Sequence, residues 1–449
     1  MGRMFGTDGV RGYVGTELTA KKAFEIGLAG AKVLAKRGEK PCILLGMDPR
    51  ISSDMLMAAL TAGICSVGVD VYNAGVVPAP AVAYLVRKYG FAAGVMVSAS
   101  HNAYYDNGIK FYNGDGYKLT DEIEDEIEAL MQRIDEIAPS SGVDVGRVLG
   151  GRDPLGDYAV FLQSCVGDVS LSGLKIALDC SNGAAYQVAP RVFKALGADV
   201  SVIADKPDGV NINDGCGSTH IETLAKHIKA GKYDMAFAFD GDGDRCFALD
   251  DVGDVLDGDM IMNIIGTHWQ SKGLLAKNTV VATIMSNLGL IKAAKESGIN
   301  VKQTKVGDRY VLEEMMAGGY CLGGEQSGHI ICLNRHTTGD GVLTALVLAA
   351  IVVESGKNLG QLNTMVQMPQ VLVNAKIKNE AKAAIMAHEA IVAEIAALEQ
   401  RFAGSGRVVI RPSGTEPLLR VMIEGEDIKE ITAEAKRIAG LMEELAEKV

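Results

Sequence analysis

The sequence contains no apolar run long enough to form a membrane-spanning helix. In 449 residues, no stretch approaches the ~20 consecutive apolar residues that are needed to cross a bilayer. The first residues, MGRMFGTDGVRG, contain no apolar core of the kind found in secretory signal peptides. We therefore expect a cytoplasmic protein that makes no contact with membranes.

Closely spaced cysteine pairs are also absent. The eight cysteines are scattered at positions 42, 65, 165, 180, 216, 246, 321 and 332, and no two of them form a C-x-x-C pair. Small disulfide-stapled domains and cysteine-based zinc sites both require closer spacing. We expect reduced and mostly buried thiols.

The chain is poor in basic clusters. Its formal net charge is −12 and it has no run of Lys or Arg. A nucleic acid is therefore excluded as a partner, because such partners select a basic surface. If the ligand is an anion, a few focused cationic groups must bind it.

Short apolar, strand-like runs alternate with helical stretches for about 350 residues. This alternation predicts α/β layers with largely parallel sheets. The pattern restarts twice, which suggests a degenerate internal triplication. The expected strands lie at 41–48, 69–75 and 92–100 in the first unit, at 174–180, 198–205 and 233–240 in the second, and at 278–285, 300–307 and 318–332 in the third.

The last 80 residues or so differ: three strand-like runs (VLVNAKIKN, RVVIRPSG and LLRVMIEG), a long amphipathic helix near 380–402 and a final helix are typical of a small α+β module. We expect three successive α/β domains with mixed sheets, followed by this module, around a central cleft that holds the site. The expected boundaries are 1–152, 153–253, 254–368 and 369–449.

The segment DGDGDR (240–245) follows an apolar strand and precedes another. Asp240, Asp242 and Asp244 alternate with glycines, so their carboxylates can converge on one hard cation. An EF-hand is excluded, because Arg245 stands where that calcium loop needs glycine. Magnesium with open positions for a phosphate oxygen fits better than calcium, and a plain acidic turn is the weaker alternative.

The segment VMVSASHN (95–102) places Ser98 and Ser100 at the end of a strand, where α/β proteins hold ligands. No G-x-S-x-G elbow surrounds them, so an acyl-transfer triad is not supported. Near a magnesium site, Ser100 is a candidate to accept and donate a phosphoryl group, and an ordinary turn residue is the alternative. His101 and Lys110 would supply charge or handle protons.

Two further loops are suited to a sugar phosphate. RPSGTEPLLR offers turn amides and two guanidinium groups to a phosphate, and GGEQSGH offers polar groups to sugar hydroxyls, with a histidine as a proton shuttle. Either segment could instead be a simple turn, and so could the N-terminal FGTDGVRG. The candidate residues are Arg411, Ser413, Gly414, Thr415 and Arg420 for phosphate, Glu325, Ser327 and His329 for the sugar, and Arg11 as a weaker phosphate contact.

Taken together, SASHN, DGDGDR, GEQSGH and RPSGTEP occur in the order that is typical of the α-D-phosphohexomutase superfamily, which the whole chain resembles. The resemblance implies that Ser100 is phosphorylated and that one Mg²⁺ per chain is bound by Ser100, Asp240, Asp242 and Asp244. It also implies catalytic roles for His101, Lys110, Arg245 and His329. Which of the candidates acts as the general base stays open.

Within the superfamily, FGTDGVRG, NINDGCGSTH (211–220) and the glutamine of GEQSGH resemble the bacterial branch that converts glucosamine 6-phosphate to glucosamine 1-phosphate. That branch implies a phosphorylated aminosugar substrate, glucosamine 1,6-bisphosphate as primer or intermediate, and a supply of precursors for UDP-N-acetylglucosamine and the cell wall. A homodimer is compatible with the resemblance.

The alternatives are a phosphomannomutase or phosphoglucomutase, a metal-dependent phosphatase, and a phosphosugar-binding protein that has lost catalysis. The last would be expected to lack the serine or an aspartate, and all four are present. One residue departs from the superfamily pattern: the serine loop usually reads S-H-N-P, and this chain has Ala103 in place of the proline. We expect activity to survive, because the chemical groups are intact.

Overall fold

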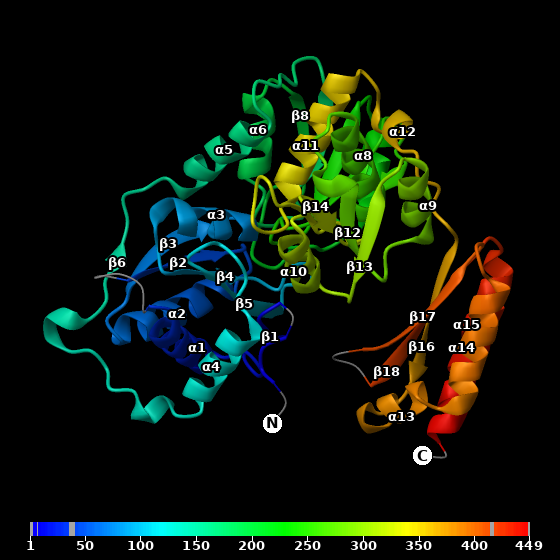
Figure 1. Ribbon diagram of the computed structural model, residues 1–449. Helices are drawn as coiled ribbons and strands as arrows, with labels where there is room; N and C mark the ends of the chain where they lie inside the picture. Colours follow the sequence, from blue (N-terminus) through cyan, green and yellow to red (C-terminus); the bar gives the residue numbers. More distant parts are fainter. Residues whose placement is uncertain (1–2, 7, 36–40, 414–416, 448–449) are drawn as a thin grey trace.

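The computed structural model describes residues 3–6, 8–35, 41–413 and 417–447. Three α/β units, coloured from blue to yellow, form the larger part of the molecule, and a smaller C-terminal unit in orange and red lies to one side (Figure 1). The predicted order, three α/β domains followed by an α+β domain, is confirmed.

The first unit is built on a mixed six-stranded sheet. Its order is β1 (Val10–Tyr13), β5 (Asp106–Asn113), β4 (Ala93–Val97), β2 (Cys42–Met47), β3 (Asp70–Val76) and β6 (Val148–Leu149), with helices α1 (Ala20–Leu34), α2 (Ser53–Ser66), α3 (Ala79–Tyr89) and α4 (Asp121–Met131). Helices α1 and α2 approach closely at Gly63, where a Cβ atom would lie 2.2 Å from the carbonyl oxygen of Phe24. Only glycine permits that approach.

The second and third units have smaller mixed sheets of five and four strands. The second sheet has the order β11 (Val255–Leu256), β10 (Cys246–Leu249), β9 (Met235–Phe239), β7 (Lys175–Asp179) and β8 (Asp199–Ile203), with helices α5 (Pro154–Cys165), α6 (Val188–Ala195) and α7 (Ile221–Ala230). The third has the order β13 (Asn300–Thr304), β12 (Thr279–Thr283), β14 (Leu322–Gly324) and β15 (Ile330–Cys332), with helices α8 (Gly258–Ser271), α9 (Leu288–Glu296), α10 (Asp308–Gly318), α11 (Gly341–Ser355) and α12 (Leu359–Leu362).

The three units repeat one strand order. In each, three strands pair in parallel and a fourth pairs antiparallel with the third, as in β3-β2-β4-β5, β8-β7-β9-β10 and β13-β12-β14-β15. This repetition supports the triplication that the sequence suggests. The loop between the third and fourth strands contains SASHN in the first unit, DGDGDR in the second and GEQSGH in the third. Three of the four sequence motifs therefore occupy one equivalent position.

The C-terminal unit has an antiparallel sheet of β16 (Gln370–Lys376), β18 (Leu418–Glu424) and β17 (Arg407–Pro412), with α13 (Lys382–Met386), α14 (Glu389–Arg401) and α15 (Ile428–Ala446). The predicted single helix near 380–402 is wrong. The chain forms α13 and α14 with a break at Ala387 and His388, because the His388 side chain accepts a hydrogen bond from the Ala390 N–H (3.2 Å) and so begins a new helix.

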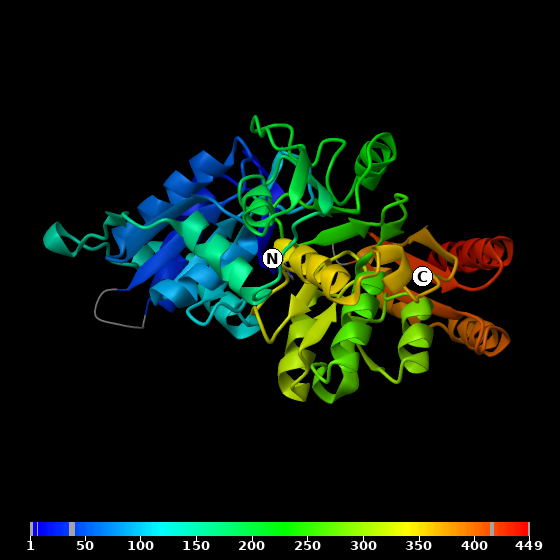
Figure 2. The same cartoon turned by 90° about the horizontal axis from the view of Figure 1, so that it is seen from above.

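One apolar core runs through the first three units, and a separate core lies within the C-terminal unit. Helix α11, with twelve buried residues, contributes much of the shared core. The C-terminal unit lies at one end of the molecule when seen from above (Figure 2). It contacts the third unit through Arg407, whose Nη1 donates to the Ile284 carbonyl (3.1 Å). Within the C-terminal unit, Glu424 on β18 accepts from Arg407 Nε (2.5 Å). Among the described residues, no helix has the length and apolar content that crossing a membrane would require.

Candidate functional site

The loop between β4 and β5 holds Ser100 in a backbone conformation that is unusual for serine. Its φ is 52°, in the left-handed region that non-glycine residues rarely adopt. The Ser100 N–H donates to Ser98 Oγ (2.9 Å), which fixes the turn. Such a strained residue in a loop at a strand end is typical of functional sites.

The Ser100 side chain points at the second unit. Its Oγ donates a hydrogen bond to Asp240 Oδ2 at 2.5 Å, and only 1% of the residue is exposed. The loops also approach closely through their backbones, because a Cβ atom on Gly241 would lie 2.4 Å from the Ser100 carbonyl oxygen. The structure therefore brings together the serine and the acidic motif, which are 140 residues apart.

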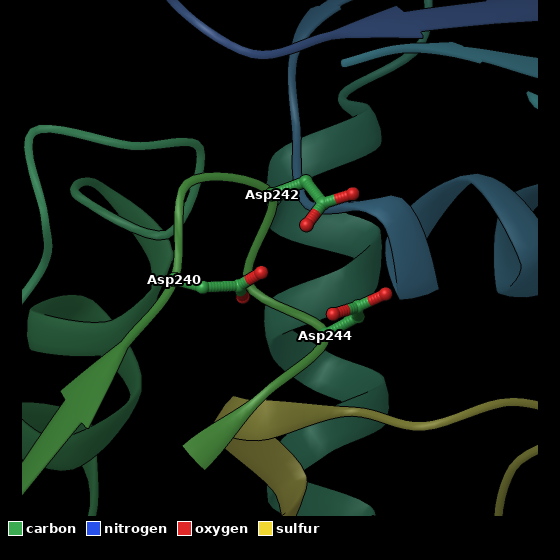
Figure 3. Close-up of side chains that lie close together, drawn as sticks. All are labelled: Asp240, Asp242 and Asp244. Carbon is green, nitrogen blue, oxygen red and sulfur yellow. The ribbon is translucent and has the colours of Figure 1, made fainter. Parts of the chain in front are cut away.

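Asp240, Asp242 and Asp244 lie in the tight loop between β9 and β10 and point toward one another (Figure 3). One carboxylate oxygen from each lies within 4.8 Å of the other two, and all three residues are buried. Gly243, with φ of 72°, permits the sharp turn. Asp242 Oδ1 and Asp244 Oδ1 have no hydrogen-bond partner among the described residues, which leaves them available to a cation.

The electrostatics of the three carboxylates also favour a cation. Burial and the charges of Asp244 and Asp242 raise the pKa of Asp240 well above its usual range. Burial has the same tendency at Asp244, but the neighbouring charges of His329, Lys110 and Arg245 outweigh it and lower that pKa. Bringing carboxylates this close is unfavourable unless positive charge is supplied. A divalent ion would supply it.

Lys110 extends from β5 to the same carboxylates. Its Nζ lies 2.7 Å from Asp242 Oδ2 and 2.8 Å from Asp8 Oδ2. Burial alone would lower its pKa, but Asp242 and Asp8 raise it above the usual value. Arg11 pairs with Asp8 from β1, so the N-terminal motif joins this cluster. Both side chains place positive charge beside the serine and the aspartates.

The two candidate histidines lie in opposite electrostatic environments. His101 Nδ1 lies 3.4 Å from Ser100 Oγ, and burial together with Arg245 and Arg11 lowers its pKa to about 4. Burial would also lower the pKa of His329, but Asp244 and Asp308, each 3.5 Å from a ring nitrogen, raise it. Near neutral pH, His101 is thus a neutral ring, whereas the two carboxylates favour the charged form of His329.

The loop between β14 and β15 presents Glu325 and Ser327. Glu325 Oε1 accepts a hydrogen bond from the Gly307 N–H (3.1 Å), and burial and Asp308 raise its pKa. Ser327 Oγ is buried and has no partner among the described residues. The negative charge of Glu325 helps to raise the pKa of Arg245, so the loop between β14 and β15 faces the DGDGDR loop.

Arg411 and Arg420 lie directly opposite each other on β17 and β18. Like charges at opposed positions of an antiparallel pair destabilise each other unless an anion lies between or beside them. Burial and Arg420 lower the pKa of Arg411, and Glu325 partly offsets the effect. Ser413 is buried, and its carbonyl accepts from Lys382 Nζ (2.7 Å). Gly414 and Thr415 lie outside the described residues.

Several residues of this cluster were not singled out from the sequence. Lys118 Nζ bridges Asp8 Oδ1 (2.6 Å) and Asp308 Oδ2 (2.5 Å), so one chain of ion pairs connects the first and third units. Asp8 lies inside the quoted FGTDGVRG, but Lys118 and Asp308 lie in segments with no recognisable pattern. A buried Asp48–Arg50 pair supports the serine loop from below.

Three α/β units with their equivalent loops turned together, followed by a fourth unit with paired arginines, define a phosphohexomutase. Family models of the phosphoglucomutase/phosphomannomutase type match nearly the whole chain: alpha/beta/alpha domain I over residues 2–138, domain II over 157–253, domain III over 257–368, and the C-terminal domain over 372–441. The chain belongs to the phosphoglucomutase/phosphomannomutase family. The superfamily resemblance is therefore confirmed.

Curated relatives are similar over their full length. A phosphoglucosamine mutase of Clostridium novyi is 54% identical over 448 residues, covering 99% of this chain and 100% of that protein. A phosphoglucosamine mutase of Caldicellulosiruptor bescii is 52% identical over 446 residues, covering 99% of both. Both chains align with all four units.

Solved structures share the fold at much lower identity. A phosphoglucomutase/phosphomannomutase family protein from Burkholderia thailandensis superposes with a TM-score of 0.81 at 24% identity, covering 98% of both chains. The N-acetylphosphoglucosamine mutase of Aspergillus fumigatus, solved with GlcNAc-6P and magnesium, has a TM-score of 0.71 at 18% identity and covers 99% of this chain and 96% of that one. These similarities establish the fold.

Proposed function

We propose that this protein interconverts glucosamine 6-phosphate and glucosamine 1-phosphate, with Ser100 carrying a phosphoryl group between the two ends of the sugar. The observation that carries the proposal is the 2.5 Å contact of Ser100 Oγ with Asp240 in the carboxylate cluster. The full-length similarity to phosphoglucosamine mutases favours the aminosugar as substrate. The enzyme class is an intramolecular phosphotransferase, an isomerase.

The residues of the acidic loop fit one magnesium ion per chain. Asp240, Asp242 and Asp244 would hold it together with an oxygen on Ser100, because the buried oxygens Asp242 Oδ1 and Asp244 Oδ1 have no described partner. Hard oxygen ligands with open positions are what Mg²⁺ prefers. When bound, the ion neutralises charge on the oxygens of the transferring phosphoryl group.

In the first step, the C1 oxygen of glucosamine 6-phosphate attacks the phosphorus of phosphorylated Ser100. The bond from phosphorus to Ser100 Oγ breaks, the bond to the C1 oxygen forms, and the C1 hydroxyl proton passes to a base while Ser100 regains a proton. The product is glucosamine 1,6-bisphosphate. Lys110 and Arg245 stabilise the charge on the transferring group, which is the main demand of phosphoryl transfer.

In the second step, the bisphosphate turns around and returns its C6 phosphoryl group to Ser100. Glucosamine 1-phosphate leaves, and the same bisphosphate can prime a protein that lacks the phosphoryl group. One anion site must therefore accept either end of the sugar. Arg411, Arg420 and the turn at Ser413 would form that site, with Arg11 as a further phosphate contact. Glu325 and Ser327 would bind hydroxyls that occupy equivalent places in both orientations.

The proton acceptor must lie near the reacting oxygen and be unprotonated before transfer. His101 lies 3.4 Å from Ser100 Oγ, and its pKa of about 4 keeps the ring neutral. Carboxylates raise the pKa of both Lys110 and His329, which suits them to charge stabilisation. Geometry and charge therefore favour His101 among the three candidates.

Sugar selection distinguishes this proposal from a phosphomannomutase or phosphoglucomutase. The purified protein should be assayed with the 1-phosphates of glucosamine, mannose and glucose side by side, each primed by its own bisphosphate. We expect the highest kcat/KM for glucosamine 1-phosphate. A clear preference for mannose 1-phosphate would overturn the substrate assignment and leave the phosphoserine mechanism in place.

A phosphatase is distinguished by the fate of the phosphoryl group. It would release inorganic phosphate steadily and would need no bisphosphate, whereas the mutase conserves the phosphate. The substrate is a charged sugar phosphate that does not cross membranes unaided, so we place the reaction in the cytoplasm. One chain contributes every residue of the proposed site, and a homodimer would serve some purpose other than completing it.

A further inference from the structure

A fully buried arginine lies underneath the serine loop. The Arg50 side chain has no exposed surface, although it extends from the segment after β2 on the first sheet. Its Nη2 donates to the carbonyl oxygens of Ser100 (2.9 Å) and Asn102 (2.8 Å). Its Nη1 donates to the carbonyls of Ala103 and Asp106, the latter at 3.1 Å. The loop therefore curls around one guanidinium group.

Asp48 fixes that guanidinium. Its Oδ2 accepts hydrogen bonds from Arg50 Nε (2.9 Å) and from Ser98 Oγ (2.6 Å). Ser98 Oγ in turn accepts from the Ser100 N–H. The Asp48 carboxylate thus positions two groups. One is the Arg50 guanidinium, and the other is the Ser98 hydroxyl that fixes the left-handed turn at Ser100. Both charges are fully buried, which is tolerated only when they are paired and hydrogen-bonded.

The second unit contributes one further contact. Asn213 Nδ2 donates to the Ser100 carbonyl (2.9 Å) and to the Asn102 carbonyl (3.1 Å), the same two oxygens that Arg50 Nη2 contacts. Asn213 has a φ of 58°, a conformation that asparagine tolerates better than most residues. The carbonyl edge of the loop is therefore held from two domains at once.

The position of Ala103 makes this support important. A proline there would restrict the backbone, and alanine does not. The Ala103 carbonyl is bound by Arg50 Nη1, and its N–H makes no hydrogen bond in the part of the chain that the structure describes. Hydrogen bonds thus replace a covalent restraint, and a proline at 103 would remove none of them.

We propose that Arg50, fixed by Asp48 and assisted by Asn213, is the positioning residue that holds Ser100 Oγ at the metal loop during phosphoryl transfer. Arg50 donates to backbone carbonyls of the serine loop and touches none of the residues to which we assign sugar or phosphate binding. Its loss should therefore lower kcat and leave KM nearly unchanged. The inference rests on the proposed function of Ser100.

The main variant is Arg50→Lys. It keeps a positive charge beside Asp48 but cannot contact four carbonyls, because an ammonium group lacks the planar fork. We expect kcat to fall by on the order of 10²-fold, the scale of a 1 Å misplacement, with KM changed by less than about threefold. Arg191→Lys, at an exposed position, is the matched control and should behave as wild type. Thermal unfolding of each variant reports whether the fold is retained.

Two further variants test positioning directly. Arg50→Lys combined with Ala103→Pro should recover part of the lost kcat, because the proline restores rigidity without the guanidinium. Asn213→Gly keeps the left-handed backbone, removes two hydrogen bonds, and should lower kcat by about tenfold with KM unchanged. The ³¹P resonance of phosphorylated Ser100 should broaden in Arg50→Lys and sharpen again in the double variant.

A folded Arg50→Lys variant with wild-type kcat would overturn the inference, and so would a KM that rises as much as kcat falls. If Arg50→Lys unfolds at the assay temperature, Asn213→Gly decides the question, and a wild-type kcat in that folded variant would overturn the inference. Failure of the underlying function looks different: the wild-type protein itself would show no mutase turnover.

Discussion

The two halves of the site differ in the kind of polar atom that they leave unpaired. In the half formed by the serine and metal loops, the buried atoms without a described partner include carboxylate oxygens of Asp242 and Asp244, beside the Nε donors of Arg11 and Arg245. In the half formed by the sugar loop and the C-terminal strands, they include the Ser327 hydroxyl and the Arg411 Nε donor, and none is a carboxylate oxygen of a residue assigned to sugar or phosphate. Unpaired acceptors attract a cation, whereas unpaired donors attract an anion and sugar hydroxyls.

The halves also differ in how they are built. Ser100, Asp240 and Asp242 are at most 1% exposed, and two domains that share a core hold them. Arg411 belongs to a domain with its own core. The reacting groups are therefore fixed before the substrate arrives, while recognition depends on how the C-terminal domain meets the other three. Fixed reacting groups, combined with a C-terminal domain whose position can adjust to the substrate, suit a substrate that must turn around between two steps.

The sharpest test of the first half is Ser100→Ala. It removes the phosphoryl carrier and little volume, so we expect turnover to fall by on the order of 10⁴-fold or more, with an unchanged unfolding temperature. Coupled assay of glucosamine 1-phosphate formation measures the loss. Ser164→Ala, at an exposed position on α5, is the control. Retained flux in Ser100→Ala would contradict the carrier role.

Asp242→Asn tests the cation that the unpaired acceptors predict. It replaces a carboxylate by an amide in a buried group of three, so we expect kcat to fall by roughly 10²–10³-fold and half-saturation to shift to higher Mg²⁺ concentration. Rates measured across a magnesium titration give both numbers. Stripping the wild type with a chelator should abolish turnover, and Mg²⁺ should restore it. If the magnesium response of Asp242→Asn were unchanged, the ion would bind elsewhere.

Arg411→Gln tests the second half and should separate it from the first. Losing one charged donor to a phosphate costs about 1.5–3 kcal/mol, so we expect KM to rise by roughly 10–100-fold with a smaller change in kcat. Arg437→Gln in the same domain is the control, because its ion pairs with Glu394 and Glu434 are exposed. A fall in kcat with constant KM would place Arg411 in the chemistry instead.

The smallest effect concerns His336, a buried histidine whose Nε2 lies 2.9 Å from the Pro80 carbonyl oxygen. Burial and the charge of Arg87 lower its pKa to about 3 from 6.5. The unfolded chain takes up this proton below about pH 6.5 and the native chain does not, so the ring's contribution to stability is lost as the pH falls from 6.5 toward 3. That loss is on the order of a few kcal/mol.

Denaturant unfolding at pH 7 and pH 5 measures this effect. Wild type should lose more stability over that interval than His336→Gln, while His220→Gln, at an exposed position, should follow wild type. An equal loss of stability between pH 7 and pH 5 in wild type and His336→Gln would show that the buried ring does not resist protonation.

The sequence predicts the parts of this site that lie in short motifs. SASHN, DGDGDR and GEQSGH are local patterns between apolar strands, and strand alternation is enough to place each at the end of a sheet. Strand alternation does not reveal that the three loops occupy equivalent hairpins, because this equivalence depends on the order of the strands within each sheet. Nor does it predict the break at Ala387, since an amphipathic pattern continues across it.

The supporting residues are harder to find because their partners are distant. Arg50 lies in MDPR, where an arginine after a strand is expected to be exposed, yet it contacts carbonyls 50 or more residues away. Lys118 and Asp308 are separated by 190 residues and meet only in the folded chain. The facing arginines at 411 and 420 follow from the register of β17 and β18, which the sequence motif alone does not give.

Peptide mapping of the protein after exposure to glucosamine 1,6-bisphosphate tests whether Ser100 carries the phosphoryl group. We predict one phosphoryl group per chain, on the peptide that contains Ser100, and its removal when excess glucosamine 6-phosphate is added, with bisphosphate as the product. Turnover of the sugar phosphates without any phosphoryl group on Ser100 would contradict the account.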